Sequence, residues 1–379
     1  MVKILHYGDS PTTADMITAD IRQSFQAQFG DAGHGYHLIA KPWAWYEHRG
    51  IGVQAEGWQS EPANRPEEAD GLFGIGGVSF VGSAGASARF TFREEGHAMV
   101  EVHALRQPGG GRVAVWAGNE RLGELDTKGA KQEEAFVNFS LPEKTRRVEL
   151  RVSAGTVRLF GVQFAKPQPG VMYSSLGVNG AHVGMLATRF REDHWSRMLQ
   201  HVKPDLVVLN YGTNESTSES FVDTSYERTL REAIRRVRKA VPGAALLIMS
   251  PMDRGQREMN GSIGTVPALA RVVKIQQKVA ADTKIAFFNT FEAMGGPGTM
   301  GRWYLAEPRL VGADLIHPMP GGAKKVGDLF YKAMVDAYNR HKTEQLRRKF
   351  SGSKTPAKSE IMKEFGTGTP SAVPLPRAQ

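Results

Sequence analysis

The stretch MVKILHYGDSPTTADM, residues 1–16, decides the fold. Residues 2–7 predict a buried strand that ends in Gly8-Asp9-Ser10, and Pro11 follows directly. Apolar residues then recur four apart from Ile17 to Phe29, so residues 11–29 are expected to form a helix. Ser10 would cap this helix, and Pro11 would take its first position, where the missing N–H costs nothing. A strand that runs straight into a helix is typical of an α/β protein.

The same alternation returns between about residues 171 and 340. Apolar runs at 206–210 and 245–249 have no polar alternation, as buried parallel strands should not. We expect a further strand at 285–288 and helices within 183–199, 226–237, 266–281 and 323–338. The fold class is therefore α/β, with a flavodoxin-like, doubly wound parallel sheet and helices on both faces.

Between these parts, the pattern changes to short strands about ten residues apart, which predicts an all-β sandwich or jelly roll. The runs are 77–81, 88–93, 99–105, 112–117, 121–125, 134–141, 147–152 and 156–164, and residues 55–72 are interpreted as a linker. Because the first strand and helix need the later sheet to bury them, the β segment is expected to be an insert. The predicted domains are 1–50 with 169–340, the insert 51–168, and a basic tail 341–379.

Composition narrows the class of protein. The chain has no cysteine, which excludes disulfides, thiolate zinc sites and cysteine nucleophiles. No run of 18 apolar residues is present and no signal peptide is expected, because the first residues already resemble a core strand. The absence of cysteine is compatible with a periplasmic, cell-envelope or secreted protein.

The formal net charge is +9, and residues 341–379 contribute 8 − 3 = +5 of it. This tail is rich in Ser, Thr, Pro and Gly, and disorder is the simplest interpretation. Its alternative role is electrostatic association with an acidic cell-wall polymer. Aromatic and basic residues do not alternate as they do in nucleic-acid binders, so no nucleic-acid partner is expected.

Polar residues follow the strands at the edge where parallel sheets bind ligands. Ser10 follows the first strand, and Asp314 precedes His317 by three residues in a turn before the last helix. Serine needs a base to take its proton, His317 can be that base, and Asp314 can orient the imidazole. The backbone N–H groups of Ser10 and Gly180 and the side-chain amide of Asn214 can form an oxyanion hole.

Each of these residues also has an ordinary structural interpretation. A serine before a helix is usually a cap, an asparagine or glycine after a strand usually makes a turn, and Asp-x-x-His is often surface polarity. Rival histidines near the same edge are His6, His34, His37 and His182, for which a metal site is an alternative. No paired metal-ligand spacing is present, so neither a metal nor another cofactor is expected. The hypothesis rests on the joint occurrence of the blocks at strand ends.

In this order, the blocks resemble those of the SGNH, or GDSL, hydrolase superfamily. They are Gly8-Asp9-Ser10, Gly180, Gly212-Thr213-Asn214 and Asp314-Leu315-Ile316-His317. The resemblance implies that Ser10 is the nucleophile, His317 the base and Asp314 its partner, with Ser10, Gly180 and Asn214 as the oxyanion hole. Pro11, Glu215, Pro318 and Pro320 depart from the family pattern.

Residues 29–36 and 175–181 are similar to bacterial peptidoglycan O-acetylesterases, which are SGNH enzymes with an inserted carbohydrate-binding-like β-sandwich. The resemblance implies a serine esterase that removes O-acetyl groups from a carbohydrate, such as peptidoglycan or another bacterial or plant polysaccharide. An O-acetyltransferase and a non-enzymatic glycan-binding protein remain alternatives. Asp9, Asp253 and Arg254 are further candidates for lining the site. Trp45, Tyr46, Trp58 and Trp116 are either sugar-stacking aromatics or core residues.

Overall fold

A computed structural model describes residues 1–65 and 69–350. Residues 1–331 form one compact unit, and a second unit, Lys332–Gln379, follows. No helix in the described part of the chain has the length and apolarity needed to cross a membrane.

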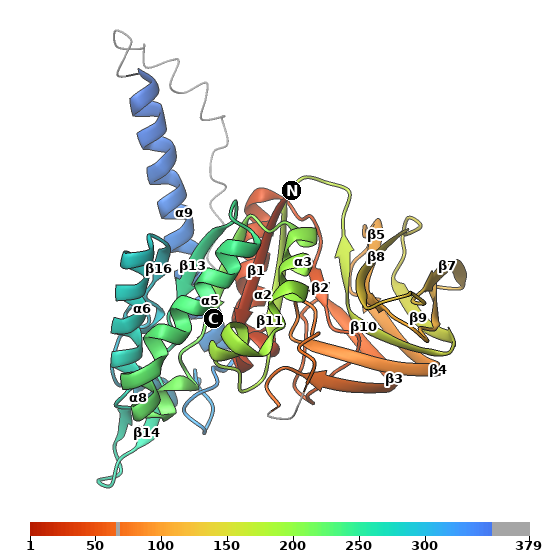
Figure 1. Cartoon of the computed structure of the whole chain (residues 1–379). Helices are drawn as coiled ribbons and strands as arrows, with labels where there is room; N and C mark the ends of the chain where they lie inside the picture. Colours follow the sequence, from red (N-terminus) through yellow and green to blue (C-terminus); the bar gives the residue numbers. More distant parts are fainter. Residues whose placement is uncertain (66–68, 351–379) are drawn as a thin grey trace. The chain divides into compact units, whose positions relative to one another are not determined.

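The first sheet is parallel and has five strands (Figure 1). In spatial order they are β11 (Val171–Gly177), β1 (Val2–Gly8), β12 (Leu206–Asn210), β13 (Ala245–Met249) and β16 (Ala286–Phe288). In chain order this is 2-1-3-4-5, the flavodoxin-like arrangement, which confirms the predicted parallel sheet. The strand order reverses at β1, so the edge beyond β1 and β12 is where such a sheet binds ligands.

Helices pack on both faces of this sheet. Successive side chains of a strand point to opposite faces, so each face can bury apolar side chains against a helix. Tyr7 packs on Trp195 of α3 (Glu192–Val202), with ring centroids 6.0 Å apart. On the other face, Tyr173 of β11 stacks on Phe25 of α2 (Met16–Phe29), at 6.4 Å. Helices α5 (Glu227–Ala240) and α6 (Leu269–Thr283) contact each other, and α5 also contacts α3.

The predicted helix 11–29 is divided in two. Helix α1 (Ser10–Thr13) ends just before Asp15, whose φ of +48° is left-handed, and α2 begins at Met16. Such a φ is costly for a residue other than glycine. Asp15 is buried there and accepts a bidentate pair of hydrogen bonds from Arg22, at 3.0 and 2.6 Å, which stabilises the break.

The second sheet is antiparallel and has nine strands. Its main path is β7-β6-β9-β4-β10-β5-β8, with β2 on β10 and β3 on β4. The bounds are β2 (Gly35–His37), β3 (Ile51–Pro62), β4 (Val78–Phe92), β5 (Met99–Arg106), β6 (Arg112–Ala117), β7 (Glu120–Asp126), β8 (Glu133–Ser140), β9 (Arg147–Ala154) and β10 (Thr156–Ala165). Phe90 of β4 packs edge-to-face on Phe164 of β10, with centroids 5.3 Å apart, within a shared core.

Two expectations about this region are wrong. The predicted linker 55–72 begins inside strand β3, whose inner residues alternate with exposed polar ones and which carries a bulge between Glu56 and Trp58. The bulge interrupts the period of two that identifies a strand. In addition, β4 is one long strand where two were predicted.

The last helix is longer than expected. Helix α9 runs from Pro320 to Phe350, so residues 341–350 of the predicted disordered tail are helical. The rest of that tail, 351–379, lies outside the described residues. Smaller elements are η1 (Met185–Arg189), η2 (Glu215–Thr217), α4 (Glu219–Phe221), η3 (Val222–Tyr226), β14 (Gly255–Arg257), β15 (Ile263–Thr265), α7 (Thr290–Ala293) and α8 (Thr299–Leu305).

Candidate active site

Ser10 lies at the junction of strand β1 and helix α1. The helix begins at Ser10 itself, and Asp9 takes the preceding cap position without a side-chain capping bond, so the expected cap role of Ser10 is displaced by one residue. Gly8 is required because a Cβ there would lie 2.2 Å from the Thr12 hydroxyl. The close packing of α1 on the strand end thus fixes the position of the Ser10 hydroxyl.

Three side chains form a continuous chain of hydrogen bonds. The Ser10 hydroxyl lies 2.7 Å from Nε2 of His317, and Nδ1 of His317 lies 2.6 Å from Oδ2 of Asp314. With Nδ1–H donated to the carboxylate, Nε2 is free to accept the proton of the serine hydroxyl. The geometry therefore places a hydroxyl group, a ring nitrogen that can accept its proton and a carboxylate within hydrogen-bond reach of one another.

The Asp314–His317 turn is built to hold these two side chains together. Oδ1 of Asp314 accepts the backbone N–H groups of Ile316 and His317, at 3.0 and 3.1 Å. Leu315, which follows Asp314, has a left-handed φ of +60°, and its carbonyl accepts the N–H of Gly255 at 2.9 Å. Partial burial acts to raise the pKa of Asp314, but the hydrogen bonds from His317 and the backbone outweigh it and hold that pKa below its usual value.

The predicted oxyanion donors come from three separate segments: the start of helix α1, the loop that carries Gly180 and the turn that carries Asn214. Within the described residues, the backbone N–H groups of Ser10 and Gly180 have no acceptor in the protein. Gly180 has a left-handed φ of +67°, and open space surrounds it. The Asn214 amide donates one hydrogen bond to the Ala181 carbonyl at 2.8 Å, which ties its loop to the Gly180 loop and leaves its second N–H.

Glu215 is a positioning residue that the sequence showed only as a departure from the family pattern. It is buried, and its two oxygens accept the N–H groups of Val183 and Gly212 at 2.8 and 3.0 Å. Burial raises the pKa of Glu215 to about 7, although these hydrogen bonds oppose the shift. The carboxyl group thus joins the two loops that carry Gly180 and Asn214.

The other predicted lining residues differ in their surroundings. Burial raises the pKa of Asp9 to about 6, against a hydrogen bond from Thr213 and the charge of His317. Arg254 is half-buried, interacts electrostatically with Asp9 and Asp314, and donates to the Thr213 carbonyl at 2.7 Å. Both therefore belong to the surroundings of the triad.

Asp253 does not share this environment. Its carboxylate accepts the Thr265 hydroxyl at 2.7 Å and the Met300 N–H at 2.9 Å, and the residue is buried. It joins β15 to α8, so its carboxylate makes a structural contact, and its place in the site lining stays a prediction.

The rival histidines His6 and His182 differ in burial. His6 is buried between Tyr173 and Asn210, and burial lowers its pKa to about 4. His182 is exposed. In the described part of the chain, the Ser10 hydroxyl is hydrogen-bonded to His317 and to neither of these two rings.

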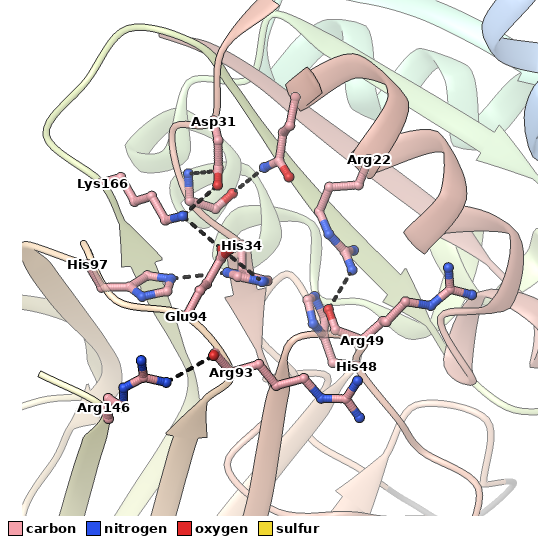
Figure 2. Close-up of polar contacts among 12 residues, drawn as sticks. Arg22, Asp31, His34, His48, Arg49, Arg93, Glu94, His97, Arg146 and Lys166 are labelled. Carbon is pink, nitrogen blue, oxygen red and sulfur yellow. Dashed lines mark hydrogen bonds and ion pairs between the residues drawn. The ribbon is translucent and has the colours of Figure 1, made fainter. Parts of the chain in front are cut away.

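His34 and His37 belong to a separate cluster with His48 and His97. Figure 2 shows His34 and His97 facing each other, and their ring nitrogens lie 3.0 Å apart. His37 and His48 have ring centroids 3.9 Å apart. Burial lowers the pKa of all four rings, and that of His34 falls to about 2. These histidines are thus neutral core residues.

One group in the described part of the chain has metal-ligating side chains within 4.8 Å of one another: Glu101, His103 and His201. Both oxygens of Glu101 already bind the histidine rings, at 2.8 and 3.0 Å. The ring–carboxylate hydrogen bonds join β5 to α3 and account for the cluster without a metal ion.

Comparison with known proteins agrees with this geometry. Residues 150–325 match the model of the GDSL-like Lipase/Acylhydrolase family. The resemblance to GDSL hydrolases is confirmed. The matched region contains Gly180, Asn214, Asp314 and His317 of the GDSL blocks, whereas Ser10 precedes it. None of the curated proteins compared with the chain matches it.

Two solved structures are similar to this chain to different extents. A peptidoglycan O-acetylesterase superposes with a TM-score of 0.76 at 22% identity, covering 90% of this chain and 92% of that one. A family two carbohydrate esterase from Clostridium thermocellum, solved with cellohexaose, has a TM-score of 0.31 at 11% identity, covering 76% of this chain and 99% of that one. The first similarity shows that this chain has the fold of a GDSL esterase along nearly its whole length.

Proposed function

We propose that the protein is a serine esterase that removes O-acetyl groups from a carbohydrate. The observation that carries the proposal is the Ser10–His317–Asp314 chain of hydrogen bonds, at 2.7 and 2.6 Å. The GDSL-like family match supports hydrolysis of an ester. Peptidoglycan is the first substrate to test, because a peptidoglycan O-acetylesterase has the same fold.

In the proposed reaction, His317 takes the Ser10 proton as the hydroxyl attacks the acetyl carbonyl. The negative charge that develops on the carbonyl oxygen is stabilised by the N–H groups of Ser10 and Gly180 and the amide of Asn214. His317 then gives the proton to the leaving sugar oxygen, and an acetyl-serine remains. Water, deprotonated by His317, attacks this ester and releases acetate, which restores the Ser10 hydroxyl.

Water is favoured over a second sugar as the acceptor. The side chains of His317 and Asp314 are 42% and 47% exposed, so solvent reaches the base directly. Acetyl transfer to a sugar is the alternative outcome, and product analysis with an added glycan acceptor separates the two. A non-enzymatic glycan-binding role does not use the hydrogen-bonded Ser10.

The wider setting is also proposed. We infer an α/β catalytic domain of residues 1–50 and 169–340 with the antiparallel segment 51–168 as a carbohydrate-binding-like β-sandwich insert. A location in the periplasm or cell envelope, with the basic residues 341–379 associated with acidic cell-wall polymer, suits a carbohydrate substrate.

The test is the Ser10→Ala variant, assayed for acetate release from O-acetylated peptidoglycan and for hydrolysis of 4-nitrophenyl acetate. Loss of the nucleophile should lower kcat by about 10⁴-fold or more on both substrates, while the circular dichroism spectrum stays unchanged. Full activity in the variant would show that the reaction does not pass through Ser10.

A further inference from the structure

Trp45 is a large aromatic side chain left in solvent close to the candidate active site. It is 50% exposed, and no other tryptophan stands among the exposed large apolar residues of the described chain. An exposed indole gains nothing from the hydrophobic effect in the free protein. Such a side chain therefore suggests a surface that something covers.

The indole is held in one orientation. Its Nε1–H donates a hydrogen bond to the side-chain oxygen of Asn179 at 3.1 Å. The neighbouring Tyr46 is buried, and its hydroxyl accepts the backbone N–H of Leu38 at 3.0 Å. Little conformational entropy remains to be lost when a ligand packs on the ring, and this favours binding.

Both anchors of this loop lead to catalytic elements. Asn179 immediately precedes Gly180, one of the predicted oxyanion donors. On the other side, the Glu47 N–H donates to the carbonyl of Thr13, the last residue of the helix that begins with Ser10. Trp45 thus lies in a loop fastened to the nucleophile helix and to the Gly180 loop.

Two asparagine side chains place polar groups beside the indole or its hydrogen-bond partner. The Asn64 side chain, from the turn after β3, donates to the Asn179 carbonyl at 2.5 Å, which brings the antiparallel sheet to the same place. Binding sites for small molecules combine an aromatic surface with a few placed polar groups. A sugar ring matches this pair, because its faces present C–H bonds and its edges present hydroxyl groups.

We propose that Trp45 is the platform on which a sugar ring of the substrate stacks while its acetyl group enters the site of Ser10. This inference rests on the proposed function, since it names the part of the protein that recognises the carbohydrate. The other candidate tryptophans are placed differently. Trp58 donates its Nε1–H to the Ser87 carbonyl within the antiparallel sheet, and Trp116 packs under Arg151 on the same sheet.

The experiment uses the full chain with Ser10→Ala, so that binding is measured without turnover. The probe is O-acetylated chitotetraose, titrated by calorimetry into Ser10→Ala and into the double variant that adds Trp45→Ala. We expect Trp45→Ala to weaken binding about tenfold and Trp45→Phe, which keeps an aromatic face, to weaken it about twofold or less. Trp116→Ala is the matched control and should leave the affinity unchanged.

A parallel assay separates this inference from the proposed function. In the background with an intact Ser10, Trp45→Ala should lower kcat/KM for O-acetylated chitotetraose about tenfold while changing kcat/KM for 4-nitrophenyl acetate less than twofold. Three results would overturn the role of Trp45: no binding of the glycan, equal affinity with and without Trp45, or a loss of affinity caused by Trp116→Ala and not by Trp45→Ala. Failure of the proposed function would appear elsewhere, as acetate release that does not depend on Ser10.

Discussion

Asp9 places a second carboxyl group beside the catalytic base. Burial raises the pKa of this group to about 6, and it interacts electrostatically with His317. In the proposed reaction, ionised Asp9 would help to stabilise the positive charge that the His317 ring acquires when it takes the Ser10 proton. This role differs from that of Asp314, which also holds the ring by a direct hydrogen bond.

Asp9→Asn should therefore lower kcat/KM several-fold above pH 7 and change it less than twofold at pH 5, where Asp9 is itself protonated. The amide removes a negative charge that the Asp9 carboxyl, whose pKa is raised to about 6, carries only at the higher pH values. The measurement is kcat/KM for 4-nitrophenyl acetate between pH 4.5 and 8. The same ratio of variant to unchanged activity at pH 5 and pH 8 would contradict this interaction.

Asp314→Asn should lower kcat by about 10²–10⁴-fold with little loss of stability. An amide cannot stabilise the imidazolium and favours the wrong tautomer of His317. The side chain is 47% exposed, so the fold should tolerate the change. Steady-state kinetics measures the expected fall in kcat, and thermal unfolding of the same preparation measures the stability. A parallel fall of kcat and Tm would indicate a structural role for Asp314.

At the residue scale, the sequence predicted side chains that meet across long separations. Ser10 and His317 are 307 residues apart. The rule that ligands bind at the carboxyl ends of parallel strands placed Ser10, and the Asp-x-x-His turn before the last helix supplied His317. Trp45 with Asn179, and Asp253 with Thr265, could not be predicted this way. Their placement depends on the conformation of loops, which no apolar period describes.

Glu215 makes the first turn after β12 part of the candidate site. Each of its oxygens accepts one backbone N–H in a buried place, so each lost acceptor leaves an unpaired donor. Glu215→Gln should lower the free energy of unfolding by about 1–3 kcal/mol, and Glu215→Ala by about twice that. Activity should fall as well, because the loops of Gly180 and Asn214 lose their link.

Urea unfolding of these variants gives the measurement. Glu219→Ala is the matched control, since that carboxylate is 60% exposed and pairs with Arg271 on the surface, where the expected change is below about 1 kcal/mol. Equal stability of Glu215→Gln and the unchanged protein would rule out the bracing role.

Elements with a strong apolar period were predicted best. The buried runs at 206–210 and 245–249 became β12 and β13 with the same bounds. The break at Asp15 was missed because the apolar residues of α2 continue the period across it, while a buried ion pair with Arg22 overrides local preference. Strand β3 was missed because a bulge and exposed polar residues hide its apolar face.

At the scale of the whole molecule, residues from the predicted α/β domain also contribute a strand to the antiparallel sheet. Strand β2 lies within residues 1–50, which the sequence assigned to the α/β part, yet it pairs with β10 of the antiparallel sheet. Such pairing has no local signature, because it is fixed by the core that both sheets share. The spacing of apolar residues predicted a parallel sheet and an antiparallel segment, but it could not predict that β2 pairs with β10.

Buried histidines give the whole molecule an acid-sensitive stability. Burial lowers the folded-state pKa of five rings: to about 4 for His6 and His97, to about 2 for His34, and well below the usual value for His37 and His48. In the unfolded chain these rings take up protons near their ordinary pKa of about 6.5. Their stabilising contribution is therefore present above pH ~6.5 and is lost as the pH falls toward the folded-state values.

Two carboxyl groups act in the opposite direction. The pKa values of Asp9 and Glu215 are raised to about 6 and about 7, so the folded state holds protons there that the unfolded state releases. At pH 5.5 the five histidines give the unfolded chain between four and five extra protons, roughly, and the two carboxyls remove between one and two. The unfolded state thus binds about three more protons than the folded state.

The free energy of unfolding should consequently fall by about 4 kcal/mol for each pH unit near pH 5.5, and it should change little between pH 7.5 and 8.5. Urea unfolding at steps of half a pH unit measures this slope, and the proton uptake on unfolding gives an independent count. A flat profile from pH 7 to 5 would mean that the histidines are already protonated in the folded protein. A steep fall confined to pH values below 4 would instead assign acid unfolding to carboxylates such as Glu101 and Glu134, whose pKa values are lowered to about 2.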